Sequence, residues 1–381
     1  MNQDISSEVL ANCKQVLNEW LAHMVKHKGS DLFLTVGFPP AMKLDGKINR
    51  LNDTPLTADE CANVARAIMS PKQAEEFANT SESNFAISLP GAARFRVNAM
   101  VQRGATALVF RIIASDIPSF DSLNLPPVLK KIALQKRGLV IFVGGTGSGK
   151  STSLASMVDY RNEHSFDHII TIEDPIEFVH PHKNSIITQR EVGVDTESWF
   201  AALKNTLRQA PDVILIGEIR DRETMDYAMA FSETGHLCMA TLHANSTNQA
   251  LDRIINFFPE ERHKQLLSDL SLNLQAFISQ RLIPKEKEKG RVAAVEVLVN
   301  SPLISDLILR GEVHSIKEIM AKSQDMGMQT YDQALYTLFE NGDISYQDAI
   351  KNADSANDLR LAIQLRSRRA QNADIDLELL E

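Results

Sequence analysis

The sequence predicts an α/β protein in which a small N-terminal α+β domain precedes a parallel sheet covered by helices. Apolar residues at near-helical spacing over 5–28 are followed by strand-like runs that end near residue 113. Residues 116–127 contain Pro118, Pro126 and Pro127 among serine, aspartate and asparagine, which is typical of a linker. From residue 139 onward, short apolar strands alternate with helical patterns, and this alternation favours a parallel sheet.

The first domain is predicted over residues 1–115. Its helical pattern at 5–28 leads into a loosely alternating segment at 31–36, which we interpret as a strand. Two further strand-like stretches lie at 95–98 and 107–113. Helices and strands that occupy separate parts of a short chain are typical of an α+β domain.

The second domain is predicted over residues 128–365. Beyond residue 247 the chain looks mostly helical, apart from a solvated loop at 284–290 and a strand at 294–299. A tail over 366–381 changes from basic to acidic, and we expect it to be poorly ordered. The strands and helices predicted before residue 247 are strands at 139–143, 169–172, 213–216 and 237–242 and helices from Gly149 and over 222–233.

Composition narrows the class of protein. The chain has 40 basic and 49 acidic residues, so its formal charge is 40 − 49 = −9, and we expect no nucleic-acid partner. The cysteines Cys13, Cys61 and Cys238 are odd in number and form no CxxC pair, which argues against a disulfide framework or a zinc ribbon. The sequence has no secretory leader pattern and no apolar run of about 20 residues, so we expect a cytoplasmic protein.

The strongest motif is LVIFVGGTGSGKST at residues 139–152. An apolar strand precedes it and a helical pattern follows, which is the context of a phosphate-binding P-loop. Glycines let backbone N–H groups surround an anion, Lys150 can reach the β and γ phosphates, and Ser151 can ligate Mg²⁺. The predicted phosphate-binding residues are Gly144, Gly145, Thr146, Gly147, Ser148, Gly149, Lys150, Ser151 and Thr152.

Two acidic segments follow the P-loop, each at the end of a predicted strand. The first is 173–177, where Pro175 prevents a simple helix and leaves the carboxylates on a loop. The second ends a buried-type strand at Glu218, and a carboxylate at that end of a strand beside the P-loop strand can reach the Mg²⁺ shell. The alternative for each segment is an ordinary surface turn.

His236 and His243 bracket the strand predicted at 237–242. They lie seven residues apart, so along a strand they would face opposite sides at a separation of ~23 Å, too far for one shared metal. Each is either a polar contact to phosphate or an acidic group, or a structural histidine bonded to backbone. An N-terminal arginine could stabilise phosphate charge, but spacing alone does not select one of Arg94, Arg96, Arg103 and Arg111.

Together these motifs resemble the secretion-superfamily hexameric ATPases and, within them, the type IV pilus retraction ATPases (the PilT/PilU family). The resemblance covers about residues 15–350. The segments that carry it are GGTGSGKST (144–152), TIEDPIEF (171–178), LRQAPDVILIGEIRD (207–221), ETGHLCMATLHAN (233–245), KGSDLFL (28–34), ARFRVN (93–98) and MGMQTYDQAL (326–335).

The resemblance implies a PAS-like N-terminal domain, a RecA-like P-loop ATPase domain with a helical C-terminal part, and ATP and Mg²⁺ as cofactors. Glu177 matches the family glutamate that acts on the attacking water, and Glu218 matches the one associated with Mg²⁺. Ser151 would be the other metal ligand.

Four further residues are implied to act in catalysis. Arg96 and Arg111 have the fifteen-residue spacing of the two family arginines that contact phosphate. His236 and His243 match the histidine-box pair. In the family, nucleotide lies between an N-terminal domain and a RecA-like domain, and ring motion follows hydrolysis.

The implied partners are five further copies of the chain in a homohexamer, a paralogous retraction ATPase and an inner-membrane platform protein, through which the protein would lie peripheral to the membrane. Ser305 and Asp306 stand where the principal motor carries an Arg-Asn pair, and the chain extends to Glu381, so it resembles the accessory branch of the family. The alternatives are an ATP-binding regulatory subunit with little turnover, and a pilus-assembly or secretion motor. Motors of the second kind commonly carry a four-cysteine element that this sequence lacks.

Overall fold

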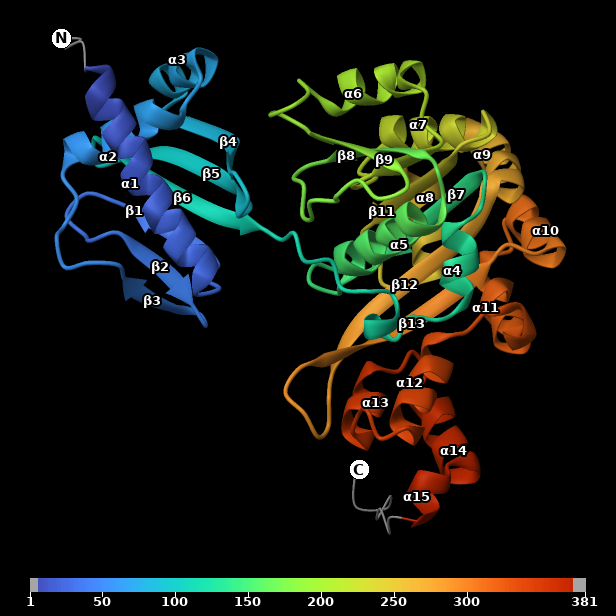
Figure 1. Cartoon of the computed structure of the whole chain (residues 1–381). Coiled ribbons are helices and arrows are strands. Elements are labelled where there is room, and N and C mark those ends of the chain that lie inside the picture. The colour runs from blue at the N-terminus through green and yellow to red at the C-terminus, as the bar shows by residue number, and fades with distance from the viewer. Residues whose placement is uncertain (1–5, 373–381) are drawn as a thin grey trace. The chain divides into compact units, whose positions relative to one another are not determined.

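The computed structural model describes residues 6–372, which divide into two compact units (Figure 1). The first unit comprises the chain up to Asp116 together with two later segments, Ile176–Val179 and Glu191–Glu197. The second unit comprises the remainder. The contiguous domains predicted from the sequence did not foresee these two segments in the first unit.

The first unit is a sheet with helices packed on one of its faces (Figure 1). Its strands follow the order β3-β2-β1-β6-β5-β4, and neighbouring strands are antiparallel. The helices bury apolar side chains such as Leu17, Leu21 and Val64 against Phe95 and Phe110 of the sheet. The elements are α1 (Ser7–Lys26), β1 (Asp31–Leu34), β2 (Ala41–Leu44), β3 (Lys47–Arg50), α2 (Ala58–Ile68), α3 (Pro71–Thr80), β4 (Glu82–Leu89), β5 (Ala93–Gln102) and β6 (Ala105–Ile113).

The second unit is built on a mostly parallel sheet of order β13-β12-β7-β11-β10-β8-β9. The strands are β7 (Gly138–Val143), β8 (His168–Glu173), β9 (Ile186–Glu191), β10 (Val213–Ile216), β11 (Leu237–Leu242), β12 (Leu274–Pro284) and β13 (Arg291–Val299). β7, β10 and β11 are buried along their whole length, as expected for parallel strands covered on both faces.

Helices and helical turns connect and cover these strands. They are η1 (Asp121–Leu123), α4 (Val128–Ala133), α5 (Lys150–His164), α6 (Trp199–Thr206), η2 (Leu207–Gln209), α7 (Arg222–Glu233), α8 (Thr247–Asn256), α9 (Glu260–Asn273), α10 (Pro302–Arg310), α11 (Val313–Lys322), η3 (Gln324–Met326), α12 (Tyr331–Glu340), α13 (Tyr346–Asn352), α14 (Ala356–Arg366) and α15 (Arg368–Asn372). None of the helices within residues 6–372 is long and apolar enough to cross a membrane.

The prediction of a mostly helical chain beyond residue 247 was wrong for residues 274–284. That segment is the strand β12, which pairs in parallel with β7 and antiparallel with β13. Its sequence LQAFISQRLIP reads equally well as a helix, and only its place beside β7 decides between the two. The strand predicted at 294–299 forms the last six residues of β13.

The predicted tail also needs correction where the structure describes it. Residue 366 ends α14, and α15 continues the fold to Asn372. The Arg369 guanidinium donates hydrogen bonds to the carbonyls of Phe339 and Ile344 at 2.6 and 2.9 Å, so this part of the chain is packed. The rest of the tail, residues 373–381, lies outside the described residues.

Gly327, inside the MGMQTYDQAL segment, lies in a turn that is packed tightly against Val128. Gly327 has φ +83°, and an added Cβ would lie 2.7 Å from the Val128 Cβ atom. Gly342 has a similar φ of +79°, but its added Cβ would meet only the flexible end of Lys287 at 3.7 Å. We expect Gly327→Ala to lower the unfolding free energy by about 2–4 kcal/mol, because overpacking adds to backbone strain. Gly342→Ala should lower it by about 1 kcal/mol, and equal urea midpoints for the two variants would contradict this account.

Candidate nucleotide-binding site

The loop between β7 and α5 has the geometry of an anion-binding loop. Gly144, Gly147 and Gly149 have φ values of +153°, +76° and +86°, which side chains rarely allow. α5 begins at Lys150, so its first N–H groups and the positive end of its dipole face the loop. The predicted P-loop therefore has the strand, loop and helix that phosphate binding requires.

Lys150 is buried against this loop. The residue is 8% exposed, and its Nζ donates hydrogen bonds to the carbonyls of Gly144 and Gly145 at 2.6 and 3.0 Å. Burial lowers the pKa of the Lys150 ammonium group, and the negative charge of Glu218 opposes that shift. A bound phosphate would place a further negative charge next to this buried ammonium group, and that charge would also favour the protonated form of Lys150.

Parallel register brings two more of the predicted residues, Glu218 and His243, to the same edge of the sheet. Leu242 of β11 pairs with Val143 of β7, so the next residue, His243, lies beside Gly144, the first glycine of the P-loop. Ile216 of β10 pairs with Ala240, so Glu218 emerges at this edge as well. Ligands of open α/β sheets bind beyond the carboxyl ends of the strands, and this edge is that crevice.

Glu218 is the centre of an ionic cluster at this edge. Its Oε1 lies 3.4 Å from the His243 Nε2, and its Oε2 accepts a hydrogen bond from the Arg220 Nε at 2.7 Å. Arg220 also pairs with Asp174, whose Oδ2 lies 3.3 Å from its Nη1. Burial and the nearby charge of Lys150 lower the pKa of His243 and favour its neutral form. Arg220 and Asp174 were not proposed as site residues, although the motif IGEIRD places Arg220 two residues after Glu218.

The two histidines predicted as a pair lie at opposite ends of β11. His236 precedes the strand, its carbonyl accepts a hydrogen bond from the Gly138 N–H at 3.0 Å, and its Nδ1 lies 3.0 Å from the Thr234 Oγ1. Gly138 begins β7, whereas the P-loop follows its end. The geometry therefore separates His236 from the P-loop of its own unit, as the seven-residue spacing predicted, and the catalytic role that the resemblance implies for it stays a prediction.

The predicted arginines and Glu177 belong to the first unit. Arg96 of β5 and Arg111 of β6 are direct cross-strand partners, so their fifteen-residue spacing puts both side chains on one face of the hairpin. The Arg111 Nε donates to the Asp31 Oδ1 at 2.7 Å, and the Arg96 Nη2 donates to the Ile176 carbonyl at 3.3 Å. Glu177, the next residue, is exposed.

A buried carboxylate lies beside these arginines in the same unit. Glu191 is 4% exposed, and its Oε2 accepts a hydrogen bond from the Ile176 N–H at 3.3 Å. Burial raises the pKa of Glu191, and the charges of Arg96 and Arg94 oppose that shift. The sequence carried no motif that pointed to Glu191, because its neighbours are distant in the chain.

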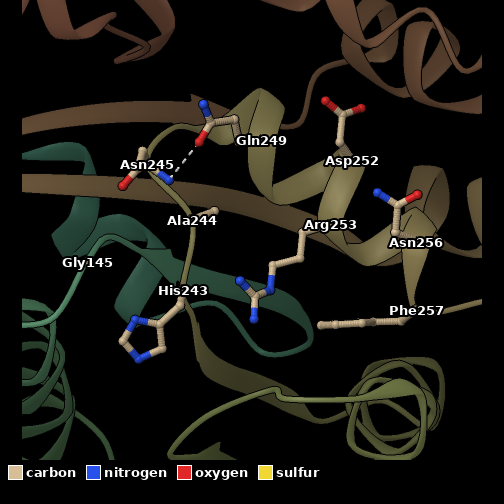
Figure 2. A pocket seen from close by; sticks show the side chains of 9 residues that line it. All are labelled: Gly145, His243, Ala244, Asn245, Gln249, Asp252, Arg253, Asn256 and Phe257. Carbon is tan, nitrogen blue, oxygen red and sulfur yellow. Dashed lines mark hydrogen bonds between the residues drawn. The ribbon is translucent and has the colours of Figure 1, made fainter.

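Among the cavities formed by residues 6–372, one at α8 and one at the C-terminal helices adjoin the P-loop. One has a volume of about 730 Å³ and reaches from Gly145 and His243 to α8. Figure 2 shows the Arg253 guanidinium lying between His243 and the Phe257 ring in this cavity. Its remaining lining residues are Ala244, Asn245, Gln249, Asp252 and Asn256.

The other cavity, of about 290 Å³, is lined by the loop over Gly144–Ser148 and by Asn245, Gln280, Arg281, Leu282 and Asn352. Arg281 crosses its wall, donating to the Asn245 carbonyl at 3.0 Å and to the Asn352 carbonyl at 2.8 Å. Because Asn352 ends α13, this cavity joins the P-loop to the C-terminal helices.

A metal at this edge would be held chiefly by phosphate. Within residues 6–372, no three or more His, Cys, Asp or Glu residues come together in a way that could hold a metal ion. Mg²⁺ usually keeps several waters and needs only one or two protein oxygens besides those of the nucleotide. Ser151, exposed at the start of α5, and Glu218 offer donors of that kind.

The fold and this edge define a P-loop nucleotide-binding protein. A model of the family described as "Type II/IV secretion system protein" matches residues 7–341, and the chain belongs to that family.

The chain is similar to named members of the family along most of its length. It is 58% identical over 344 residues to the type IV pilus ATPase PilU of Pseudomonas aeruginosa, and the matched region covers 90% of each chain. It is 42% identical over 337 residues to the pilus retraction ATPase PilT of the same organism, covering 88% of this chain and 98% of that one. A crystal structure of the pilus retraction motor PilT with bound ADP superposes with a TM-score of 0.83 at 40% identity, covering 90% of this chain and 98% of that one.

Proposed function

We propose that this protein is an Mg-ATP-hydrolysing motor that drives or assists type IV pilus retraction. The observation that carries the proposal is the P-loop edge, where Lys150, Glu218 and His243 meet in a chain similar to PilU over nearly its whole length. P-loop hydrolysis depends mainly on positioning and on charges that stabilise the transferring phosphate, and this edge supplies both.

The groups at this edge, and Glu177 of the first unit, each have a part in the proposed reaction. The loop amides and Lys150 bind and neutralise the phosphates, while Ser151 and Glu218 would hold Mg²⁺, the ion that draws charge from the phosphoryl group. Arg220 and His243 fix the Glu218 carboxylate through its two oxygens. Glu177 would orient the attacking water, as its place in the TIEDPIEF motif implies.

The working form is proposed to be a homohexamer. Arg96 and Arg111, side by side on their hairpin, would contact nucleotide phosphate in the assembled ring. The antiparallel sheet with helices on one face supports a PAS-like first unit, and the parallel sheet with its P-loop supports a RecA-like second unit. The proposed partners are a paralogous retraction ATPase and a platform protein of the inner membrane, with the motor on its cytoplasmic side.

Deleting the gene tests the motility function. We expect a strain lacking this protein, alone or together with its paralogue, to lose twitching spread or retraction force in at least one of the two backgrounds. Optical-trap measurement of single-pilus retraction would give the force. Unchanged force in both backgrounds would overturn the motility proposal. If the purified chain turns over ATP only when its paralogue is added, the regulatory-subunit alternative would replace an independent motor.

A further inference from the structure

Gln280 is a buried polar side chain directly beneath the P-loop. It belongs to β12, in which Ser279 pairs with Val143, the last residue of β7. Gln280 therefore lies level with the first residue of the loop, and it is 2% exposed. No sequence motif singled it out, and a buried amide must find hydrogen-bond partners to offset its desolvation.

Its two partners lie on either side of the loop's end. The Gln280 Nε2 donates a hydrogen bond to the Ser148 carbonyl at 2.9 Å, and its Oε1 accepts one from the Ser153 hydroxyl at 2.8 Å. Because a carbonyl only accepts, the amide nitrogen must face Ser148, and this assigns the orientation of the side chain. Gln280 thus joins the last turn of the loop to the first turn of α5.

The loop is also shaped to fit against this residue. An added Cβ at Gly149 would lie 2.6 Å from the Gln280 Nε2, and one at Gly144 would lie 2.7 Å from the Gln280 carbonyl oxygen. Both positions have φ values in the left-handed region as well. Two glycines of the P-loop are therefore required partly because Gln280 approaches so closely.

The bond to Ser148 has a consequence for phosphate binding. A trans peptide is planar, so the carbonyl of Ser148 and the N–H of Gly149 point in opposite directions. Holding that carbonyl against Gln280 turns the Gly149 N–H away from β12. Loop N–H groups bind phosphate only when they converge on it.

We propose that Gln280 is a positioning residue that orients the Ser148–Gly149 peptide so that its N–H faces the phosphate of the bound nucleotide. This inference rests on the proposed nucleotide-binding function of the same loop. Gln280 acts through the backbone and touches no reacting atom. It contributes to nucleotide affinity before any hydrolysis, so ADP binding reports on it directly.

The experiment compares Gln280→Met with the wild-type chain in binding of fluorescent ADP and in steady-state ATP hydrolysis. Methionine keeps the volume and removes both hydrogen bonds. We expect the ADP dissociation constant and the KM for ATP to rise about tenfold, the loss expected for one well-placed buried hydrogen bond. Gln329→Met is the matched control, because the Gln329 Nε2 donates to the Val295 carbonyl at 2.7 Å away from the loop.

Wild-type ADP affinity in Gln280→Met would overturn the proposal, even if its melting temperature fell, because a purely structural role predicts that pattern. If Gln280→Met does not fold, Gln280→Leu decides the question. Leucine is smaller and has no group that can donate to Ser148, so its ADP affinity should fall as far, and unchanged affinity would again overturn the proposal. A wild-type chain that binds ADP but never hydrolyses ATP would sink the motor function while leaving the role of Gln280 testable.

Discussion

Replacing Lys150 with alanine should reduce ATP turnover at least ~100-fold, the scale of losing one charge-stabilising group at a phosphoryl or oxyanion site. Lys150 is held beside the loop by two carbonyls, so its ammonium group is already in place when phosphate arrives. Alanine removes the positive charge that offsets charge on the transferring group. Phosphate release at saturating Mg-ATP gives the rate.

The same change should leave the fold intact. α5 is anchored by Leu154, Met157 and Val158 in the core of the second unit, and none of these contacts depends on Lys150. Lys322→Ala is the control, because Lys322 is an exposed lysine paired only with Glu318 on the same helix. A Lys150→Ala protein that melts like the wild type and hydrolyses ATP at the wild-type rate would refute the mechanism.

The sequence predicted the central part of the fold well because that part is locally determined. β10, β11 and α7 have the predicted bounds, since each is a short apolar or amphipathic segment between clear breaks. β12 was missed because its sequence is equally compatible with a helix. Only its pairing with β7, a long-range contact, makes it a strand. The grouping of residues 176–179 and 191–197 with the first unit was likewise not foreseen, because contiguous domain bounds follow sequence order alone.

The candidate site also contains residues that the sequence could predict and residues that it could not. The P-loop, Glu218 and His243 could be predicted because each follows a strand in a recognisable motif, and parallel register then brings them to one edge. Gln280 could not be predicted, because its hydrogen bond with Ser153 joins residues that lie 127 positions apart in the sequence. The spacing of His236 and His243 predicted their positions at opposite ends of a strand, and β11 confirms that separation.

Glu177→Gln should slow ATP hydrolysis strongly while leaving nucleotide binding intact. The structure fixes the backbone on both sides of this exposed residue. The Ile176 carbonyl accepts a hydrogen bond from Arg96, and Phe178 forms a β-bridge with Ala114, so Glu177 projects from an anchored segment. Glutamine has nearly the same shape but cannot accept a proton from water, and a general base typically contributes 10²–10⁴-fold.

We therefore expect turnover by Glu177→Gln to fall at least ~100-fold at saturating Mg-ATP, with an ADP dissociation constant within about twofold of the wild type. Glu197→Gln removes another exposed carboxylate of the same unit and should hydrolyse ATP normally. Slow hydrolysis with normal ADP binding would distinguish Glu177 from Glu218, the other glutamate proposed for the reaction. Glu218→Gln disturbs the ionic cluster with His243 and Arg220, and it should also weaken the dependence of nucleotide binding on Mg²⁺. Full activity in Glu177→Gln would move the role of general base to a carboxylate at the P-loop edge itself, with Glu173 the first to test, because it ends β8 and is held by the Thr171 hydroxyl at 2.6 Å.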